Sequence, residues 1–251
     1  MSGGARDSGF GLRDPSRVSR IANLESQRIP NPGSERIPNC EPRIPRLNAI
    51  IDVDAAERAG WTPIDLAHAF LAGDATFLQL RAKRLSGAAF LETATAIRAL
   101  AGDRDARLIV NDRADIAALA GADGVHVGQE DLAPAAVRRI VGAAAIVGVS
   151  THTLEQVDRA VDEPVSYIAI GPVFATDTKD TGYDAVGLDL VRAAAARARA
   201  AGLPLVAIGG ITLERARDVI AAGASCVAVI TDLLATGDPA ARVRQYRHAL
   251  A

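Results

Sequence analysis

Gln79, Arg81 and Lys83 alternate with small or apolar residues at the end of an apolar stretch. Side chains of an extended chain alternate between two faces, so these three polar groups point to one side and Leu78 and Leu80 to the other. Two cations and an amide crowded together repel one another unless an anion lies among them. The spacing therefore predicts half of a diphosphate-binding site, with a solvent-exposed strand edge as the alternative.

Two carboxylates, Asp112 and Asp131, follow later apolar stretches and are expected near the same cations. Mg²⁺ binds oxygen ligands and typically takes one or two carboxylates together with phosphate oxygens of a substrate. Considered alone, Asp112 is equally well explained as the N-cap of a helix that begins at Arg113. The pair of carboxylates beside the cations favours a magnesium site.

The glycine pair Gly209-Gly210 and the stretch 229–231 predict a second anion site. Glycine lets a backbone approach a ligand closely, and a helix that starts near Thr212 would direct free N–H groups outward. The polar loop 174–182 is a candidate lid, with a plain surface loop as the alternative. Its donors for an anion are Thr176, Thr178 and Lys179.

Two histidines lie near these segments. His126, inside an expected strand, is interpreted as a packed, hydrogen-bonded residue rather than a base. His152 follows Ser150 at the end of another strand, and its role stays open. The sequence offers no convincing pair of a nucleophile and its base.

From residue 47 onward, short apolar runs alternate with amphipathic helical patterns. Gly121-Ala122 and Gly223-Ala224 end two of these helices just before the next run. Eight strands, each followed by a helix, in about 200 residues predict a (β/α)8 barrel (TIM barrel), whose active sites lie at the C-terminal strand ends. An open doubly wound sheet is the competitor, but it normally has fewer strands and a glycine-rich turn after the first. The expected strands are 47–53, 77–81, 107–111, 124–127, 145–150, 167–170, 204–208 and 226–230.

The composition is that of a soluble globular protein, with 251 residues, 49% hydrophobic, 23% charged and a net charge of -2. Near-neutral charge without a basic stripe argues against nucleic acid, and no apolar run reaches the ~18 residues of a membrane span. Cys40 and Cys226 lie far apart without zinc spacing, so a cytoplasmic protein is expected. Residues 1–46, rich in proline and polar residues, are expected to be a disordered tail before a domain at 47–251, although a wrongly assigned start codon would look the same.

Six motifs occur in one order along the expected domain. They are Gln79-x-Arg81-x-Lys83, Val110-Asn111-Asp112, Asp123-Gly-Val-His-Val-Gly-Gln-Glu-Asp131, Gly148-Val-Ser-Thr-His152, Gly171-Pro-Val-Phe-Ala-Thr-Asp-Thr-Lys179 and Ile208-Gly-Gly-Ile211. Each motif alone is weak, but together they make residues 47–251 resemble the thiamine phosphate synthase family. Two positions depart from the family pattern: Ala175 stands where proline is common, and Thr231 where serine is common.

The resemblance implies a transferase that joins two small phosphorylated substrates with Mg²⁺ as cofactor. These are 4-amino-2-methyl-5-hydroxymethylpyrimidine diphosphate and 4-methyl-5-(2-phosphoethyl)thiazole, and the products are thiamine phosphate and diphosphate. The implied chemistry is dissociative: the diphosphate leaves first, and the thiazole nitrogen captures the resulting cation. Whether the protein forms a homo-oligomer stays open.

The resemblance also implies a role for each matched residue. Gln79 would contact the pyrimidine, and Ser150 would hydrogen-bond near the pyrimidine and the leaving group. Asp112 and Asp131 would coordinate Mg²⁺. The diphosphate would be held by Arg81, Lys83, Asn111 and Lys179. The thiazole phosphate would be surrounded by Thr176, Thr178, Gly210, Ile230 and Thr231.

Two rival functions remain. A thiazole tautomerase on the same barrel would need an acid–base residue and one phosphate site without metal, and it usually carries a histidine where this chain has Pro172. A non-catalytic sensor of thiamine precursors, or a scaffold recruited through the tail, would make magnesium irrelevant. The complete set of ligand-binding residues favours the synthase over both.

Overall fold

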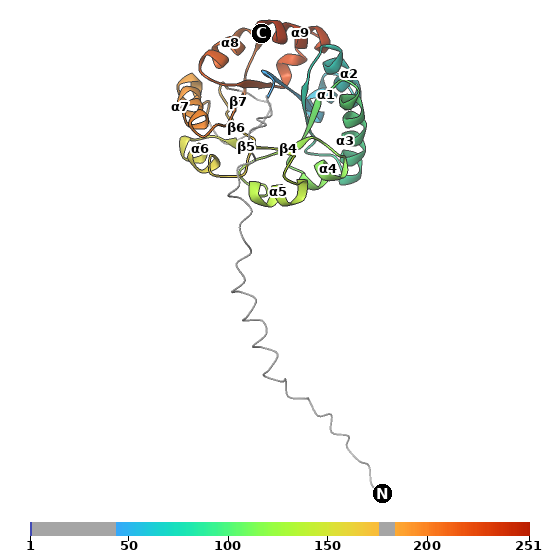
Figure 1. Ribbon diagram of the computed structural model, residues 1–251. Helices are drawn as coiled ribbons and strands as arrows, with labels where there is room; N and C mark the ends of the chain where they lie inside the picture. Colours follow the sequence, from blue (N-terminus) through green and yellow to red (C-terminus); the bar gives the residue numbers. More distant parts are fainter. Residues whose placement is uncertain (2–43, 176–183) are drawn as a thin grey trace. The chain divides into compact units, whose positions relative to one another are not determined.

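The computed structural model describes Met1, residues 44–175 and residues 184–251. Within these residues, eight parallel strands form a closed barrel in which each strand pairs with the next and β8 pairs with β1 (Figure 1). The predicted (β/α)8 barrel is confirmed, and the open doubly wound sheet is wrong. The strands are β1 (Leu47–Asp52), β2 (Phe77–Arg81), β3 (Arg107–Asn111), β4 (Gly124–Val127), β5 (Ile146–Thr151), β6 (Tyr167–Ile170), β7 (Leu205–Ile208) and β8 (Cys226–Val229).

The helices form a ring around these strands (Figure 1). Gly121 (φ 62°) and Gly223 (φ 107°) follow the C-caps of α4 and α8 in the left-handed region, as predicted for helix-ending glycines. The helices are α1 (Val53–Arg58), α2 (Pro63–Ala72), α3 (Gly87–Gly102), α4 (Ala114–Leu119), α5 (Pro134–Val141), α6 (Leu154–Ala160), α7 (Gly187–Ala200), α8 (Leu213–Ala221) and α9 (Pro239–Ala249), with a 3-10 helix, η3 (Thr231–Leu233), after β8.

The first strand is one residue shorter than predicted, because Val53 already belongs to α1. The side chain of Asp52 accepts a hydrogen bond of 2.9 Å from the backbone N–H of Ala55 and so caps this helix. An aspartate at the end of an apolar strand therefore begins the next helix.

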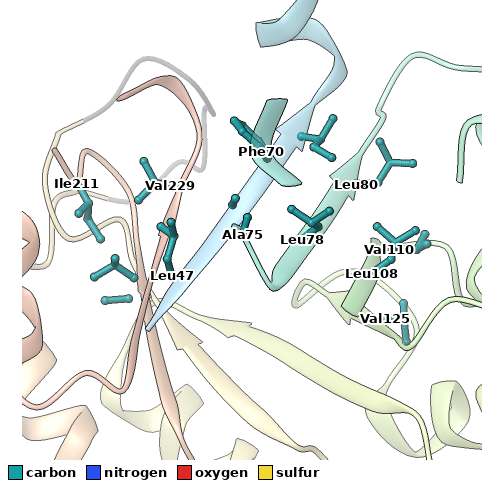
Figure 2. Packing of buried hydrophobic residues seen from close by; sticks show 14 of the residues in the cluster. Leu47, Phe70, Ala75, Leu78, Leu80, Leu108, Val110, Val125, Ile211 and Val229 are labelled. Carbon is teal, nitrogen blue, oxygen red and sulfur yellow. The ribbon is translucent and has the colours of Figure 1, made fainter. Parts of the chain in front are cut away.

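Apolar side chains pack on both faces of the barrel sheet. Outward-facing residues such as Leu78 and Leu80 of β2 and Leu108 and Val110 of β3 join the core between strands and helices (Figure 2). Inward-facing residues form a second cluster, which includes Ile50, Phe77, Ile109, Tyr167, Val206 and Cys226. Because the strands are buried on both faces, any polar group inside the barrel needs a hydrogen-bond partner.

The barrel belongs to one compact unit, which ends at Ala251. The predicted tail, residues 1–46, lies almost entirely outside the described residues, so its disorder stays a prediction. In the described ranges, each helix is too short or too polar to cross a membrane.

Candidate active site

A cavity of about 700 Å³ opens at the C-terminal ends of the barrel strands. Predicted site residues from opposite sides of the barrel line it together. Those in the lining are Gln79, Arg81, Asn111, Ser150, Gly210, Ile230 and Thr231. Lys83, Asp112 and Asp131 lie at the same end of the barrel, beyond β2, β3 and β4, but outside this lining. Thr176, Thr178 and Lys179 lie outside the described residues.

The cation Arg81 has a carboxylate partner that the sequence analysis missed. Arg81 ends β2 opposite Asp52 in the strand register, and its guanidinium forms an ion pair with the Asp52 carboxylate. Asp52 is only 2% exposed and Arg81 13%, so the pair is largely removed from water. The repulsion predicted between the clustered cations is therefore reduced by carboxylates of the protein itself.

Three buried amides form a hydrogen-bonded relay across the first three strands. Asn48 Nδ2 donates to Gln79 Oε1 at 3.1 Å, and Gln79 Nε2 donates to Asn111 Oδ1 at 3.1 Å. Asn48, a residue that the sequence analysis did not single out, is the second residue of β1 and points into the barrel. The relay fixes the side chain of Gln79 beside Arg81 and Asn111.

A second ion pair and a pair of carboxylates lie at the ends of β2, β3 and β4. The Lys83 ammonium contacts the Asp112 carboxylate, while Asp131 accepts a hydrogen bond of 2.7 Å from the N–H of Gly128. Burial raises the pKa of the Asp131 carboxyl and the Asp112 carboxylate adds to the rise, while the Gly128 N–H and Lys83 oppose it. Asp112 and Asp131 thus lie close enough to repel each other.

The alternative role of Asp112 as a helix cap is wrong. Helix α4 begins at Ala114, its N-cap is Arg113, and no side chain caps it. Asp112 instead adopts a left-handed backbone conformation (φ 63°), and its N–H donates to the carbonyl of His126 at 2.7 Å. Its side chain is therefore available to the site.

The hydroxyl of Ser150 is held by His126 from the neighbouring strand. His126 Nε2 lies 2.8 Å from Ser150 Oγ, and its Nδ1 lies 2.9 Å from the Tyr167 hydroxyl. The rings of His126 and Tyr167 are stacked, with centroids 5.5 Å apart. Burial raises the pKa of Tyr167, so its phenol stays neutral. The interpretation of His126 as a packed, hydrogen-bonded residue is confirmed. His152 also lines the cavity, and its Nδ1 contacts the carbonyl of Gly171.

The opposite side of the cavity is formed by the glycine pair and the loop after β8. Gly210 has a positive φ of 62°, and a Cβ there would lie 2.6 Å from the carbonyl oxygen of Ala175. Only glycine therefore fits this close contact. Arg215, which the sequence analysis also missed, donates to the carbonyl of Gly210 at 3.1 Å and lies over the ring of Phe174. Its guanidinium brings a positive charge to this side of the cavity.

Asp232, directly after Thr231, connects this side of the cavity to the last helix. Its carboxylate accepts hydrogen bonds from the N–H of Leu213, the guanidinium of Arg242 and the hydroxyl of Tyr246. Burial and the Asp232 carboxylate raise the pKa of Tyr246, so its hydroxyl keeps its proton and donates. The network holds the beginning of α8 against η3.

Comparisons with known proteins agree with this geometry. A family model described as thiamine monophosphate synthase matches residues 49–233. A thiamine-phosphate synthase of Methanoculleus marisnigri is 47% identical over 76% of this chain and 90% of that protein. One from Koribacter versatilis is 45% identical over 83% of this chain and 97% of that protein.

A solved structure of a thiamine phosphate pyrophosphorylase from Pyrococcus furiosus superposes with a TM-score of 0.73 at 29% identity. The match covers 82% of this chain and 95% of that one. The residues that the family model matches include all of β2 to β8 and most of β1, the strands that form the barrel around the cavity. The chain belongs to the thiamine monophosphate synthase family and is an enzyme.

Proposed function

We propose that this protein is a thiamine phosphate synthase, a transferase that joins 4-amino-2-methyl-5-hydroxymethylpyrimidine diphosphate to 4-methyl-5-(2-phosphoethyl)thiazole. The observation that carries the proposal is the shared cavity. Gln79, Arg81 and Asn111 line one side of it, and Gly210 and Thr231 line the other. Two anionic substrates can therefore meet with their reactive atoms between the two sets of residues.

The diphosphate binds to Arg81, Lys83 and Asn111. Arg81 offers N–H groups in a fixed fork that suits phosphate oxygens, and Lys83 adds a mobile positive charge. Asn111 accepts from Gln79 through its Oδ1, so its amide N–H groups are the part that can bind an anion. Gln79 contacts the pyrimidine. Lys179, outside the described residues, is assigned to the diphosphate by its position in the family motif.

The residues present suit a magnesium ion. Burial raises the pKa of Asp131 and the neighbouring Asp112 carboxylate adds to that rise, and a divalent cation relieves the repulsion between the two carboxylates. Among the described residues no group of three or more acidic, histidine or cysteine side chains could hold a metal. Two carboxylates together with substrate oxygens form the ligand set that Mg²⁺ commonly takes. When bound, Mg²⁺ would supply charge that stabilises the leaving diphosphate.

The chemistry needs no nucleophile from the protein. The bond between the pyrimidine methylene and the diphosphate breaks first, with the electron pair leaving on the diphosphate oxygen. Arg81 and Lys83 stabilise this developing charge, and Ser150, oriented by His126, hydrogen-bonds beside the leaving group. The thiazole nitrogen then attacks the cationic methylene carbon. Gly210, Ile230 and Thr231 hold the thiazole phosphate and so orient that nitrogen.

The test is to mix the purified protein with both substrates, with and without Mg²⁺, and to measure thiamine phosphate by fluorescence after oxidation. We expect product that depends on both substrates and disappears with a chelator. We expect Asp112→Ala to lower turnover by about 10²-fold or more, because it removes a contact that stabilises the leaving group. Product at an undiminished rate without metal, or near-normal turnover of the variant, would contradict the assigned roles.

A further inference from the structure

Asn48 carries a buried polar atom that lacks a hydrogen-bond partner. Its Oδ1 has no partner within the described part of the chain, although the residue is only 1% exposed. A buried carbonyl oxygen without a partner destabilises the folded protein, so it calls for an explanation. Because Asn48 lines the cavity, a bound ligand can supply the missing donor.

The direction of the amide relay explains why an acceptor lies at this end. Asn111 must turn N–H groups toward an anion, so its Oδ1 accepts from Gln79. Gln79 then presents its Oε1 to Asn48, which donates through Nδ2. What remains at the Asn48 end is a carbonyl oxygen. Reversing all three amides would turn the oxygen of Asn111 toward the diphosphate, which is repulsive.

The walls around this end of the relay are apolar. Ile50, Val206 and two small residues, Ala169 and Ala228, line the same part of the barrel interior. A flat neutral ring fits such walls, whereas a second phosphate would lose its hydration without gaining a cation. The surroundings therefore select a ring that carries an N–H donor.

We propose that Asn48 recognises the exocyclic amine of the aminopyrimidine substrate. Its Oδ1 accepts a hydrogen bond from that amine, and its Nδ2 fixes the orientation of Gln79. This inference rests on the proposed function, because it assumes that the pyrimidine diphosphate is the substrate and names the group of its ring to which the barrel interior hydrogen-bonds. Recognition of the amine at Asn48 and of the anion at Asn111 are then coupled through Gln79.

The experiment combines a change in the protein with a change in the substrate. Calorimetry measures the Kd of the pyrimidine diphosphate and of an analogue with hydrogen in place of the amine. Binding rather than turnover is measured, because the amine also stabilises the cation during the reaction. We expect removal of the amine to weaken binding to the wild-type protein about 10-fold or more, since a hydrogen bond to a buried acceptor is lost.

For Asn48→Leu, which keeps the volume but lacks the acceptor, we expect removal of the amine to weaken binding at most about 2-fold. Asn48→Ala gives a second version if the leucine disturbs packing. Cys226→Ala is the matched control, because Cys226 is a buried interior residue whose thiol contacts the backbone of Asn48 but does not line the cavity. It should discriminate the two ligands as the wild type does.

If the wild type and both Asn48 variants discriminate equally between the two ligands, the inference is overturned. The hydrogen-bond donor to Asn48 Oδ1 would then be a buried water molecule rather than the substrate. A wild-type protein that binds neither ligand and forms no thiamine phosphate overturns the proposed function instead. Loss of discrimination in the Cys226→Ala control would also overturn the inference, because it would show a general response of the barrel interior.

Discussion

Removing the hydroxyl of Tyr246 tests whether α9 supports the active site. The side chain is fully buried, and its hydroxyl donates to Asp232 Oδ2 at 2.6 Å. The Tyr246→Phe variant keeps the ring and its packing but leaves the carboxylate with one donor fewer. Hydrogen bonds to charged groups contribute roughly 1.5–3 kcal/mol. Asp232 keeps Arg242 and the N–H of Leu213 as donors, so we expect a loss of about 2 kcal/mol from the free energy of unfolding.

For a domain of this size, a loss of that magnitude lowers Tm by roughly 4–8 °C. Urea unfolding followed by circular dichroism gives the free energy, and calorimetry gives Tm. Arg247→Ala is the matched control on the same helix, because Arg247 forms an exposed ion pair with Asp74. Such pairs contribute about 0–1 kcal/mol, so this variant should be nearly as stable as the wild type.

The same variant should affect only one substrate. Asp232 follows Thr231 and binds the N–H of Leu213, so a looser Asp232 should raise KM for the thiazole phosphate several-fold, by about 1 kcal/mol. KM for the pyrimidine diphosphate should not change, because Arg81 and Asn111 lie on the other side of the cavity. A free energy of unfolding within about 0.5 kcal/mol of the wild type would refute the assigned hydrogen bond. Equal changes in both KM values would refute the idea that Asp232 acts on the side of the cavity that binds the thiazole phosphate.

Two further substitutions test other parts of the site. Gly210→Ala should raise KM for the thiazole phosphate about 10-fold, because the new Cβ would meet the Ala175 carbonyl at 2.6 Å. Gly121→Ala is the matched control, because Gly121 has the same φ of 62° but open space around it. It should lower the free energy of unfolding about as much as Gly210→Ala does and leave the KM values of both substrates unchanged. Asp52→Asn should lower the free energy of unfolding by about 2–4 kcal/mol, because it leaves Arg81 without its buried charged partner. Urea titration measures this loss, and an unchanged midpoint of urea unfolding would contradict it.

The sequence predicts which strand carries a residue better than it predicts what that residue touches. Gln79 and Arg81 reach the same cavity because alternation along a strand is a rigid geometric rule. Lys83 lies beyond the end of β2, where that rule no longer applies, and it reaches Asp112 rather than the cavity lining. The barrel itself was predictable because its strands are buried on both faces and read as apolar runs.

The hydrogen-bond and ion-pair partners of these polar residues could not be predicted from the sequence by the same rule. Asp52 lies inside the apolar run 47–53, which predicts a strand, so nothing in the sequence marks it as the partner of Arg81. Asn48 is one polar residue in a similar run, and its bond to Gln79 joins residues 31 positions apart. Both contacts depend on which strands lie side by side in the closed barrel. A polar residue inside an otherwise apolar strand is the one signal that could have identified Asn48.

The charges at the ends of β1 to β4 bear directly on the role of magnesium. Asp52 and Asp112 pair there with Arg81 and Lys83, so both cations proposed to hold the diphosphate are already engaged by carboxylates. A cation that is paired with a carboxylate attracts a diphosphate less strongly than a free cation does. If Asp112 and Asp131 hold Mg²⁺ as proposed, the Asp112 carboxylate would be shared with the metal and Lys83 would be able to turn toward the substrate. Magnesium should therefore tighten the binding of the diphosphate, measured by calorimetry with and without the metal, and not only assist its departure.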